Sequence, residues 1–541
     1  MSLAGGGLWI SCLWLVIYAV KYSSRRSKSL LPFSQSRRPS TEVSLKNLNL
    51  RVKTEVFNAF HDELSTRLSS KPSAMLRQTL LRLYDLGSII STIGMLAAFC
   101  LLLSTVVTLS LDVLRTRHVT HQSTSVVTKR GMDHVEDTFS SIAPGHNAFT
   151  INPIIPGVTV PFSHLPLILL ALGISQIVHE AGHAITAALH RIPMLASGVS
   201  ITFIFPSAFV ILPSARLENL LPRDRMQVVA GGCFHNFAFL CFLLLAAWSG
   251  IGSVFASLLF QDVSALGKVI VGIEYDSPLI AHLPVGTLIT KMDDVQMGSA
   301  AQTTMADPWD DYLLSPASTP TRGWCVDQSL LSKVSGQECI AVGLQSCFIS
   351  KEDAAVQYSL SPAPVFTENA ARCNSSMECA PSASCVVPRS DQQLVRITVA
   401  WDYAGNSGKD IVVWKGPKRE IWEQVEVGNL RPRFSFISRK LPSVVSCFFE
   451  YMKLANLSLY LVNMLPLTVL DGHQLLIALL ELLFGRASGG LGSDDLEASN
   501  NRSWTPHDSS AQRTCRAFLS MSTLVLVTLC ALLGVIRWSE N

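Results

Sequence analysis

Long apolar tracts constrain the fold of this chain more than any other feature. Each residue of an α-helix adds 1.5 Å, so about 20 apolar residues cross the ~30 Å hydrocarbon core of a bilayer. Tracts that could serve as spans or anchors lie at residues 8–20, 87–111, 165–189, 227–251, 443–484 and 517–536. Only 15% of the residues are charged, against about 25% in soluble domains. We therefore expect a polytopic α-helical membrane protein with about six transmembrane spans.

One further apolar segment, residues 195–213, lacks the pattern of a helix. Gly198, Pro206 and Pro213 interrupt a run that is rich in valine, isoleucine and phenylalanine, which favours extended strands joined by a turn. Extended backbone survives at membrane depth only where protein covers it or where it lines a cavity. We expect a hairpin that dips into the membrane.

Basic residues set the expected orientation of the chain. Lys21, Arg25, Arg26 and Lys28 follow the first tract, so the positive-inside bias places this segment in the cytoplasm. The first tract is not preceded by a basic region or followed by a clear cleavage site, which favours an uncleaved anchor over a signal peptide. Counting the spans forward places residues 252–442 in a lumen.

Cysteine usage agrees with a lumenal position for residues 252–442. Six of the 13 cysteines lie in this stretch, at Cys325, Cys339, Cys347, Cys373, Cys379 and Cys385. An oxidising compartment favours three disulfides among them, in a pairing that the spacing does not fix. A zinc knuckle is the weaker alternative, because the stretch has no CxxC pair. Asn374 begins an Asn-Ser-Ser glycosylation sequon that a lumenal loop could use.

The rest of this stretch favours β structure. Residues 267–297 alternate short β-rich runs with turns, and residues 394–401 and 409–416 supply further strands. We expect a small β domain that carries the cysteine-rich piece as an insertion at about residues 320–390. The net charge is only +3, and no basic run is interleaved with aromatic residues, which argues against direct binding of nucleic acid.

His179, Glu180 and His183 form an HExxH pattern inside the apolar tract 165–189. The two histidines lie ~40° apart on one helix face and can reach the same metal ion, while Glu180 can activate a water molecule there. The pentapeptide alone also occurs by chance in soluble helices. Ionisable residues within a membrane are costly and mark functional sites by default, so a metal site is favoured here. His190 is expected to be a solvated residue at the end of the helix.

A catalytic zinc site needs a third protein ligand. The tract 443–484 offers Asp471, an embedded carboxylate. Helical rise places His179 ~20 Å and Asp471 ~27 Å into their tracts, both toward the cytoplasmic side of a ~30 Å core. Because these depths are compatible, we predict one zinc ion per chain, held by His179, His183 and Asp471. His473 is a weaker candidate for the third ligand.

Three motifs together resemble those of the site-2 protease family of intramembrane zinc metalloproteases. They are HEAGH (179–183), AGGCFHN (230–236) and NMLPLTVLDG (463–472), in this order and each in an apolar tract. The expected β domain looks like the PDZ domain of that family. Its cysteine-rich insertion, and the segment INPIIPGVTVPFSHLP (151–166), resemble the eukaryotic, Golgi-type branch. The resemblance runs from about residue 150 to residue 485.

The resemblance implies a role for each of these site residues. His179, His183 and Asp471 would bind zinc, and Glu180 would be the catalytic base. Asn236 and Asn463 would help to hold the substrate strand or the oxyanion. A hydrogen bond between helices remains an alternative for Asn236, and capping of a broken helix remains one for Asn463.

The resemblance also implies partners and a location. The substrates would be membrane-anchored transcription factors that a lumenal protease has already cut, and cleavage would release a cytosolic fragment to the nucleus. The protein would be a multi-pass protein of the Golgi, or of the endoplasmic reticulum and Golgi, in contact with lipid and not directly with nucleic acid. Its lumenal PDZ-like domain would exclude substrates that keep a bulky lumenal part.

Hydrolysis within a membrane makes two demands on such a protein. Water must reach the site by a hydrophilic path, which is short when the site lies near the cytoplasm. A transmembrane substrate must also unwind locally, because its backbone is hydrogen-bonded within its own helix. An edge strand of the hairpin at residues 195–213 could pair with the backbone thus exposed.

We divide the chain according to these predictions. The segments are 1–85 (anchor and cytoplasmic basic segment), 86–163 (second span and lumenal loop), 164–251 (HEAGH helix, hairpin and AGGCFHN helix), 252–442 (lumenal PDZ-like domain), 443–485 (LDG motif) and 486–541 (polar loop and C-terminal span). A multipass metal-binding transporter or a scaffold is the alternative function. A transporter predicts more intramembrane carboxylates and inverted repeats, neither of which the sequence has. A scaffold leaves the depth of Asp471 unexplained.

Overall fold

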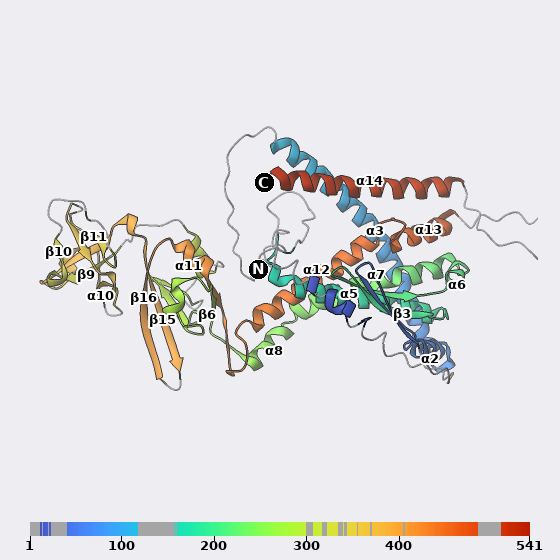
Figure 1. The fold of residues 1–541 in the computed structure, drawn as a ribbon, viewed down its shortest axis with the longest axis horizontal. Helices are drawn as coiled ribbons and strands as arrows, with labels where there is room; N and C mark the ends of the chain where they lie inside the picture. Colours follow the sequence, from blue (N-terminus) through green and yellow to red (C-terminus); the bar gives the residue numbers. More distant parts are fainter. Residues whose placement is uncertain are drawn as a thin grey trace, which may run out of the picture. The chain divides into compact units, whose positions relative to one another are not determined.

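The chain forms two compact units, which are described separately (Figure 1). The computed structural model describes residues 11–12, 14–19, 21–22, 40–116, 156, 159–298, 307–315, 322–333, 339, 343–353, 355–367, 370–403, 406–484 and 510–540. The first unit, here the helical unit, comprises residues 1–126, 133–249 and 446–541; the second, here the β unit, comprises residues 127–132 and 250–445. The predicted basic residues Arg25, Arg26 and Lys28, and most of the loop at 485–516, lie outside the described residues.

Long apolar helices build the helical unit, as the sequence predicts. They are α3 (Ala74–Thr116), α5 (Leu165–Leu189), α7 (Pro222–Trp248), α12 (Leu441–Asn463), α13 (Asp471–Phe484) and α14 (Ser510–Glu540). Four helical stretches among the described residues are long and apolar enough to cross a membrane, namely Lys71–Leu114, Phe162–Leu189, Pro222–Trp248 and Ser510–Arg537. The tract at 443–484 is divided between α12, which carries the paired Glu450 and Lys453, and the 14-residue α13.

Helix α7 is the centre of the helical unit. It packs against α3, α5 and α13, while α14 packs against α3. Met226, Val229 and Cys233 of α7 share a buried cluster with Leu475 and Leu476 of α13. These contacts hold together the three helices that carry the conspicuous motifs of the sequence.

A four-stranded antiparallel sheet completes the helical unit. Its strands are β1 (Thr41–Lys46), β2 (Asn49–Thr54), β3 (Ala196–Thr202) and β4 (Phe205–Ile211), in the order β1-β2-β3-β4. The hairpin expected at residues 195–213 is therefore present as β3 and β4. The pairing of β2 with β3, with Asn49 opposite Thr202, was not predicted. It makes β4 the end strand of this sheet on the side away from β1.

The β unit contains a sheet with the order β16-β15-β7-β6-β17, in which β8 also pairs with β7. The strands are β6 (Lys268–Ile273), β7 (Leu288–Met292), β8 (Val295–Gln296), β15 (Leu394–Tyr403), β16 (Asn406–Lys415) and β17 (Val425–Gly428). Alternate residues such as Ile270, Ile289 and Ile397 point into one core, which α9 (Pro308–Leu314) closes with Trp309. α11 (Lys418–Gln424) adds Ile421 to the same core.

The cysteine-rich insertion forms a second sheet, between β8 and β15 in the sequence. Its strands are β9 (Gly323–Asp327), β10 (Ser332–Lys333), β11 (Ser346–Ser350), β12 (Gln357–Leu360), β13 (Arg372–Cys373) and β14 (Ala383–Pro388), in the order β10-β12-β11-β14-β9-β13. Trp324, Phe348 and Phe366 form its core, against which Ile411 and Val413 of β16 pack. The insertion is thus joined to the first sheet by apolar contacts.

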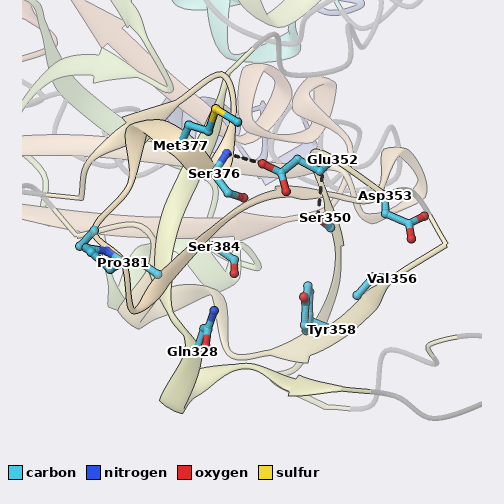
Figure 2. Close-up of a pocket in the computed structure, with 12 residues that line it drawn as sticks. Gln328, Ser350, Glu352, Asp353, Val356, Tyr358, Ser376, Met377, Pro381 and Ser384 are labelled. Atoms are coloured by element: carbon cyan, nitrogen blue, oxygen red, sulfur yellow. Dashed lines mark hydrogen bonds between the residues drawn. The ribbon is translucent and has the colours of Figure 1, made fainter.

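A cavity of about 560 Å³ opens in this insertion (Figure 2). Its lining includes Glu352, Asp353 and Tyr358, together with Met377, which is 94% exposed. Glu352 Oε1 accepts a hydrogen bond from the Ser376 backbone at 2.9 Å, which ties the two sides of the cavity together. None of the residues that we predict to act in catalysis or metal binding lines this cavity.

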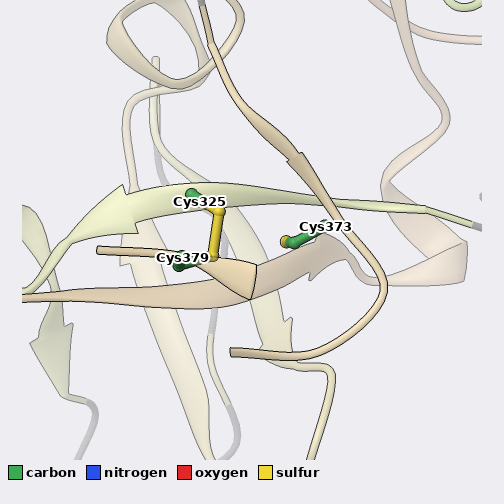
Figure 3. Close-up of side chains that lie close together, drawn as sticks. All are labelled: Cys325, Cys373 and Cys379. Carbon is green, nitrogen blue, oxygen red and sulfur yellow. A yellow bond between two sulfur atoms is a disulfide. The ribbon is translucent and has the colours of Figure 1, made fainter. Parts of the chain in front are cut away.

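The six cysteines of the insertion form three disulfides, as predicted. The pairs are Cys325–Cys379, Cys339–Cys347 and Cys373–Cys385. The sulfur atoms of Cys325, Cys373 and Cys379 lie within 4.8 Å of one another, but Figure 3 shows the first and third joined by a bond, and Cys373 is bonded to Cys385. Because these sulfurs are oxidised, they offer no thiolate to a metal, and the zinc-knuckle alternative is not supported.

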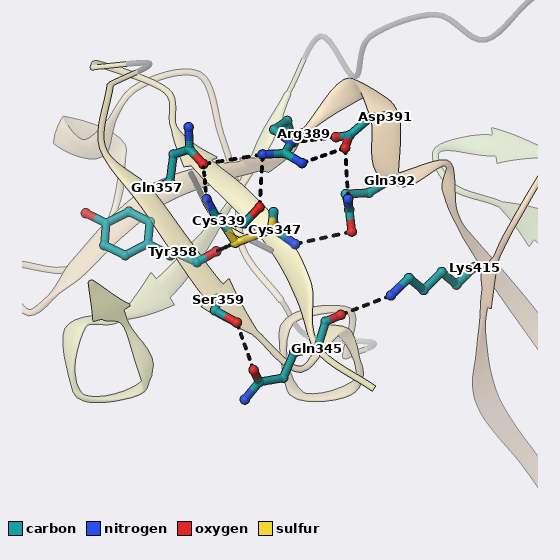
Figure 4. Close-up of a disulfide and its surroundings, with 10 residues drawn as sticks. All are labelled: Cys339, Gln345, Cys347, Gln357, Tyr358, Ser359, Arg389, Asp391, Gln392 and Lys415. Atoms are coloured by element: carbon teal, nitrogen blue, oxygen red, sulfur yellow. Dashed lines mark hydrogen bonds and ion pairs between the residues drawn. A yellow bond between two sulfur atoms is a disulfide. The ribbon is translucent and has the colours of Figure 1, made fainter. Parts of the chain in front are cut away.

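The Cys339–Cys347 disulfide lies in a polar network (Figure 4). Arg389 Nη1 donates to the carbonyl of Cys339 at 3.2 Å, and its Nε donates to Asp391 at 2.6 Å. This guanidinium holds the pKa of Asp391 at about 2, well below its usual range. Gln392 Oε1 accepts from the Cys347 backbone at 3.4 Å. Hydrogen bonds therefore hold the backbone of both cysteines of this disulfide.

Candidate metal centre

Helix α5 brings the two histidines of the HExxH pattern together. Pro166 lies in its first turn, where a missing N–H costs nothing. His179 and His183, one turn apart, have ring centroids 4.8 Å apart and Nε2 atoms 3.1 Å apart. His179 is buried and His183 is half-buried. Both Nε2 atoms therefore converge on one point beside the helix.

Asp471, the first residue of α13, lies at the same point. Its Oδ2 is 3.0 Å from His179 Nε2 and 3.3 Å from His183 Nε2. The three donor atoms lie within 4.8 Å of one another. A Cβ at Gly472 would be 2.3 Å from the Met464 carbonyl oxygen, so the turn before α13 needs a glycine there. Two imidazoles and one carboxylate are a donor set that suits zinc and leaves a fourth position open.

His473, the competing candidate for the third ligand, is not in this cluster. Its Nδ1 is 3.5 Å from the hydroxyl of Ser520 on α14. Since α13 is helical from Asp471 onward, residues 471 and 473 point to different sides of the helix. The structure thus places Asp471 beside the two histidines and places His473 beside α14 instead.

Both histidines are held from behind by α7. His183 Nδ1 lies 2.9 Å from the carbonyl oxygen of Val228, which accepts a hydrogen bond when this nitrogen carries the proton. His179 Nδ1 lies 3.2 Å from Nδ2 of Asn236, whose Oδ1 is buried without a partner in the described part of the chain. The oxygen and nitrogen of an amide are assigned from their surroundings, and exchanging them lets Oδ1 accept from His179 Nδ1. A metal-binding histidine usually donates its other N–H in this way.

Glycines let α7 approach the two histidines closely. A Cβ at Gly232 would be 2.4 Å from His183 Nε2 and 2.7 Å from His179 Nε2, which leaves no room for a side chain. A Cβ at Gly182 would be 2.3 Å from the Gly231 carbonyl oxygen, so α5 and α7 touch through their backbones. The AGGCFHN motif therefore contacts the two histidines at two places, through Gly232 and through Asn236.

Glu180 faces the four-stranded sheet. Its Oε2 accepts a hydrogen bond from the backbone N–H of Val210 on β4 at 2.9 Å, and the side chain is half-buried. The backbone N–H of Val210 points away from β3. Successive residues of a strand direct their backbone groups alternately to its two sides. The end strand of the sheet and the carboxylate of the HExxH pattern are thus in direct contact.

Asn463 and Asn456 both lie on α12 but differ in their contacts. Asn463 is the last residue of the helix, half-buried, and its side chain makes no hydrogen bond within the described part of the chain. Asn456 is fully buried and donates to Ser175 Oγ at 3.0 Å, one turn before His179 on α5. Sequence reasoning missed Asn456, although an amide in an apolar tract is the signal that singled out Asp471.

His190 belongs to a polar network and is not simply solvated. Its Nε2 lies 2.7 Å from Oε1 of Gln227, and the Gln227 amide donates to Asp85 on α3 at 2.7 Å. Arg223 donates to both oxygens of Asp85. This network joins three helices of the helical unit, and sequence reasoning did not find it because its members are far apart in the chain.

Comparison with known proteins identifies the family of this chain. The sequence profile of peptidase family M50 matches residues 167–490, a range that includes the three clustered side chains. The chain is 28% identical, over 142 residues, to the membrane-bound transcription factor site-2 protease homolog of Arabidopsis thaliana; the match covers 26% of this chain and 27% of that protein. The chain thus matches about a quarter of the length of this curated relative. On the profile match, this chain belongs to peptidase family M50, a family of zinc metalloproteases.

Proposed function

We propose that this chain is an intramembrane zinc endopeptidase. His179, His183 and Asp471 hold the metal, with one zinc ion per chain. The observation that carries the proposal is the convergence of their three donor atoms within 4.8 Å, from two helices that are far apart in the sequence. The membership in family M50 supports peptide hydrolysis over transport or scaffolding.

Glu180 is the catalytic base in this proposal. A zinc ion in such a centre acts as a Lewis acid and lowers the pKa of water toward neutrality. The Glu180 carboxylate accepts the proton of the attacking water and returns it to the amine that leaves. Its hydrogen bond from Val210 orients the carboxylate, and the half-buried position limits access of other water.

We assign Asn236 to the positioning of His179, and we keep Asn463 as a candidate for substrate binding. Asn236 is fully buried behind the imidazole, where an unwound substrate strand has no access. This favours the contact between helices over the substrate role that the resemblance implies for Asn236. Asn463 is half-buried and ends α12, and the turn after it leads directly to Asp471 at the start of α13. This place in the chain, beside a proposed metal ligand, supports the substrate role for Asn463.

Strand β4 is the proposed docking edge for the substrate. It pairs with β3 on one side, and on its other side Val210 donates to Glu180. Ala208 directs its backbone groups to that same side, because it lies two residues away on the strand. An unwound substrate segment that pairs there would bring a peptide bond next to Glu180.

Replacing Ala208 tests this docking edge. Ala208→Pro removes one outward N–H on an end strand, where proline is tolerated, while Ala208→Val keeps the N–H. We expect cleavage of a model transmembrane substrate to fall in the proline variant and to persist in the valine variant. Equal cleavage by both variants would argue against pairing of the substrate with β4.

The wider role follows from the resemblance and from the relative's name. We propose that the substrates are membrane-anchored transcription factors, cut beforehand by a lumenal protease, and that the cytosolic fragment moves to the nucleus. The Arabidopsis relative, by its name, is a homolog of a protease of membrane-bound transcription factors. About six spans, a PDZ-like identity and size-filter role for the β unit, and residence in the Golgi belong to the same proposal. Asn374 is exposed, as a glycosylated residue must be.

The variant Glu180→Gln tests the proposed reaction most simply. The full chain is reconstituted in lipid, and cleavage of a model transmembrane substrate is measured together with bound zinc. We expect zinc to stay bound, because Glu180 is not a ligand, and cleavage to be lost, because an amide cannot accept the proton. Normal cleavage by this variant would refute the proposal that Glu180 is the base.

A further inference from the structure

We propose that the β unit carries a face that lies in the headgroup region of a phospholipid bilayer. This face, here the apolar face, consists of α8 (Ile251–Leu259) and residues 433–440. Its partner is the lipid surface itself. The inference goes beyond the proposed function and does not depend on it, since neither the metal centre nor the protease reaction enters the argument.

Helix α8 (IGSVFASLL) is apolar apart from Ser253 and Ser257, and none of its residues is buried. Val254, Phe255 and Leu258 are each more than 60% exposed, at 63%, 66% and 63%. The helix has nine residues and carries no charge. An isolated helix of this length is marginal in water, and an exposed apolar patch marks a contact with a membrane or with another protein.

A second segment extends this face. Strand β18 (Leu430–Pro432) pairs with β5 (Phe260–Asp262), which places the residues after β18 next to α8. The backbone N–H of Arg433 donates to the Leu259 carbonyl at 2.9 Å, and its Nε donates to the Ser257 carbonyl at 3.0 Å. Phe434 and Phe436 follow, stacked with ring centroids 5.5 Å apart. Phe436 is 84% exposed, so the aromatic pair adds to the apolar surface.

The position of α8 in the chain favours lipid over a protein partner. α8 begins three residues after Trp248, which ends α7, a helix apolar and long enough to span a membrane. The 27 residues of α7 rise ~40 Å, more than the ~30 Å core, so α8 is not needed for crossing. Gly250, at φ +70°, interrupts the helix between the two. A short apolar helix directly after a span is therefore placed at the membrane surface.

Charge and aromatic content fit the same partner. Trp248 is 87% exposed, and tryptophan is enriched where a span meets the headgroups. Arg439 and Lys440 follow the phenylalanine pair and are exposed; Lys440 also pairs with Glu426 at 2.8 Å. Basic side chains beside an apolar surface contact lipid phosphates. The face thus combines apolar residues with flanking cations, as interfacial helices do.

Photo-crosslinking in the full chain tests this inference. p-Benzoylphenylalanine replaces Phe255 or Phe436, and the protein is irradiated in nanodiscs of phosphatidylcholine and phosphatidylglycerol. The same replacement of Met377, which is 94% exposed in the insertion, is the control for a position in water. Replacement of Phe518, which is 70% exposed on the spanning helix α14, is the control for a position in lipid.

We expect phospholipid adducts at positions 255 and 436 in yields near that at position 518 and several-fold above that at position 377. Yields no higher than at position 377 would overturn the inference, as would adducts mainly with a second copy of the chain. Hydrogen exchange of the unmodified chain provides a check that needs no substitution. The amides of residues 251–259 should be protected in nanodiscs, and exchange as fast as in an unfolded peptide would also overturn the inference.

Discussion

In the helical unit three ionisable side chains from two helices converge on one point, whereas in the β unit a charged pair joins the two sheets. His179 and Asp471 meet with their donor atoms 3.0 Å apart, and Asn236 supports the histidine from behind. In the β unit Arg372 of the insertion pairs with Asp294 of the first sheet and stacks on Trp324 at 3.7 Å. Donor atoms that converge on one position can hold a metal ion, while a charged pair between two sheets joins one sheet to the other.

The two units also use cysteine differently. The six cysteines of the insertion are all oxidised in pairs. The free cysteines that the structure describes include the buried Cys233 and Cys447, which pack in apolar clusters of the helical unit. Disulfides thus add to the apolar cores of the β unit, whereas Cys233 and Cys447 stabilise the helical unit through packing. Each variant below is expected to affect one unit and to spare the other.

Removal of the disulfide with the longest loop should have the largest effect on stability. Cys325 and Cys379 are 54 residues apart, whereas Cys339 and Cys347 are 8 apart. Loop-closure entropy predicts a loss in free energy of unfolding of about 4 kcal/mol for paired serine substitutions at the first bridge and about 2.5 kcal/mol at the second. Calorimetry of the full chain should show this order, with bound zinc unchanged. Equal losses in free energy of unfolding at the two bridges would contradict the expected order. Loss of zinc would contradict the separation of the disulfides from the metal centre.

Substitution of Asn236 should have a smaller effect, confined to the helical unit. Asn236→Leu removes the acceptor for His179 Nδ1–H, and loss of such a support weakens metal binding by about 10–100-fold. Asn236→Asp keeps an acceptor and should retain most of the affinity. Competition of the full chain with a chelator measures both values, with Asn463→Ala as the control. Unchanged zinc affinity in Asn236→Leu, with a raised KM, would instead support the substrate role.

Much of the candidate site could be predicted from the sequence. An ionisable residue in an apolar tract is costly, so His179, His183 and Asp471 stand out without any knowledge of the fold. Their proximity also follows from depth, because position along a spanning helix fixes height in the membrane. The hairpin at 195–213 is visible for a similar reason, since proline and glycine exclude a helix there.

Other features could not be predicted, because they depend on contacts between distant segments. The strands β1 and β2 join β3 through pairs such as Asn49 with Thr202, which are 153 residues apart. The contact of Val210 with Glu180 depends on which edge of β4 faces α5. The disulfide pairing depends on the order of strands in the second sheet. Local patterns hold no information about such arrangements.

The zinc content of Asp471→Ala tests the central claim most directly. The full chain is reconstituted in lipid and its metal is measured for the unaltered protein, for Asp471→Ala and for the neighbouring control His473→Ala. We predict about one zinc ion per chain in the unaltered protein and in His473→Ala, and loss of zinc in Asp471→Ala. Retention of zinc by Asp471→Ala, or its loss in His473→Ala, would contradict the proposed metal centre.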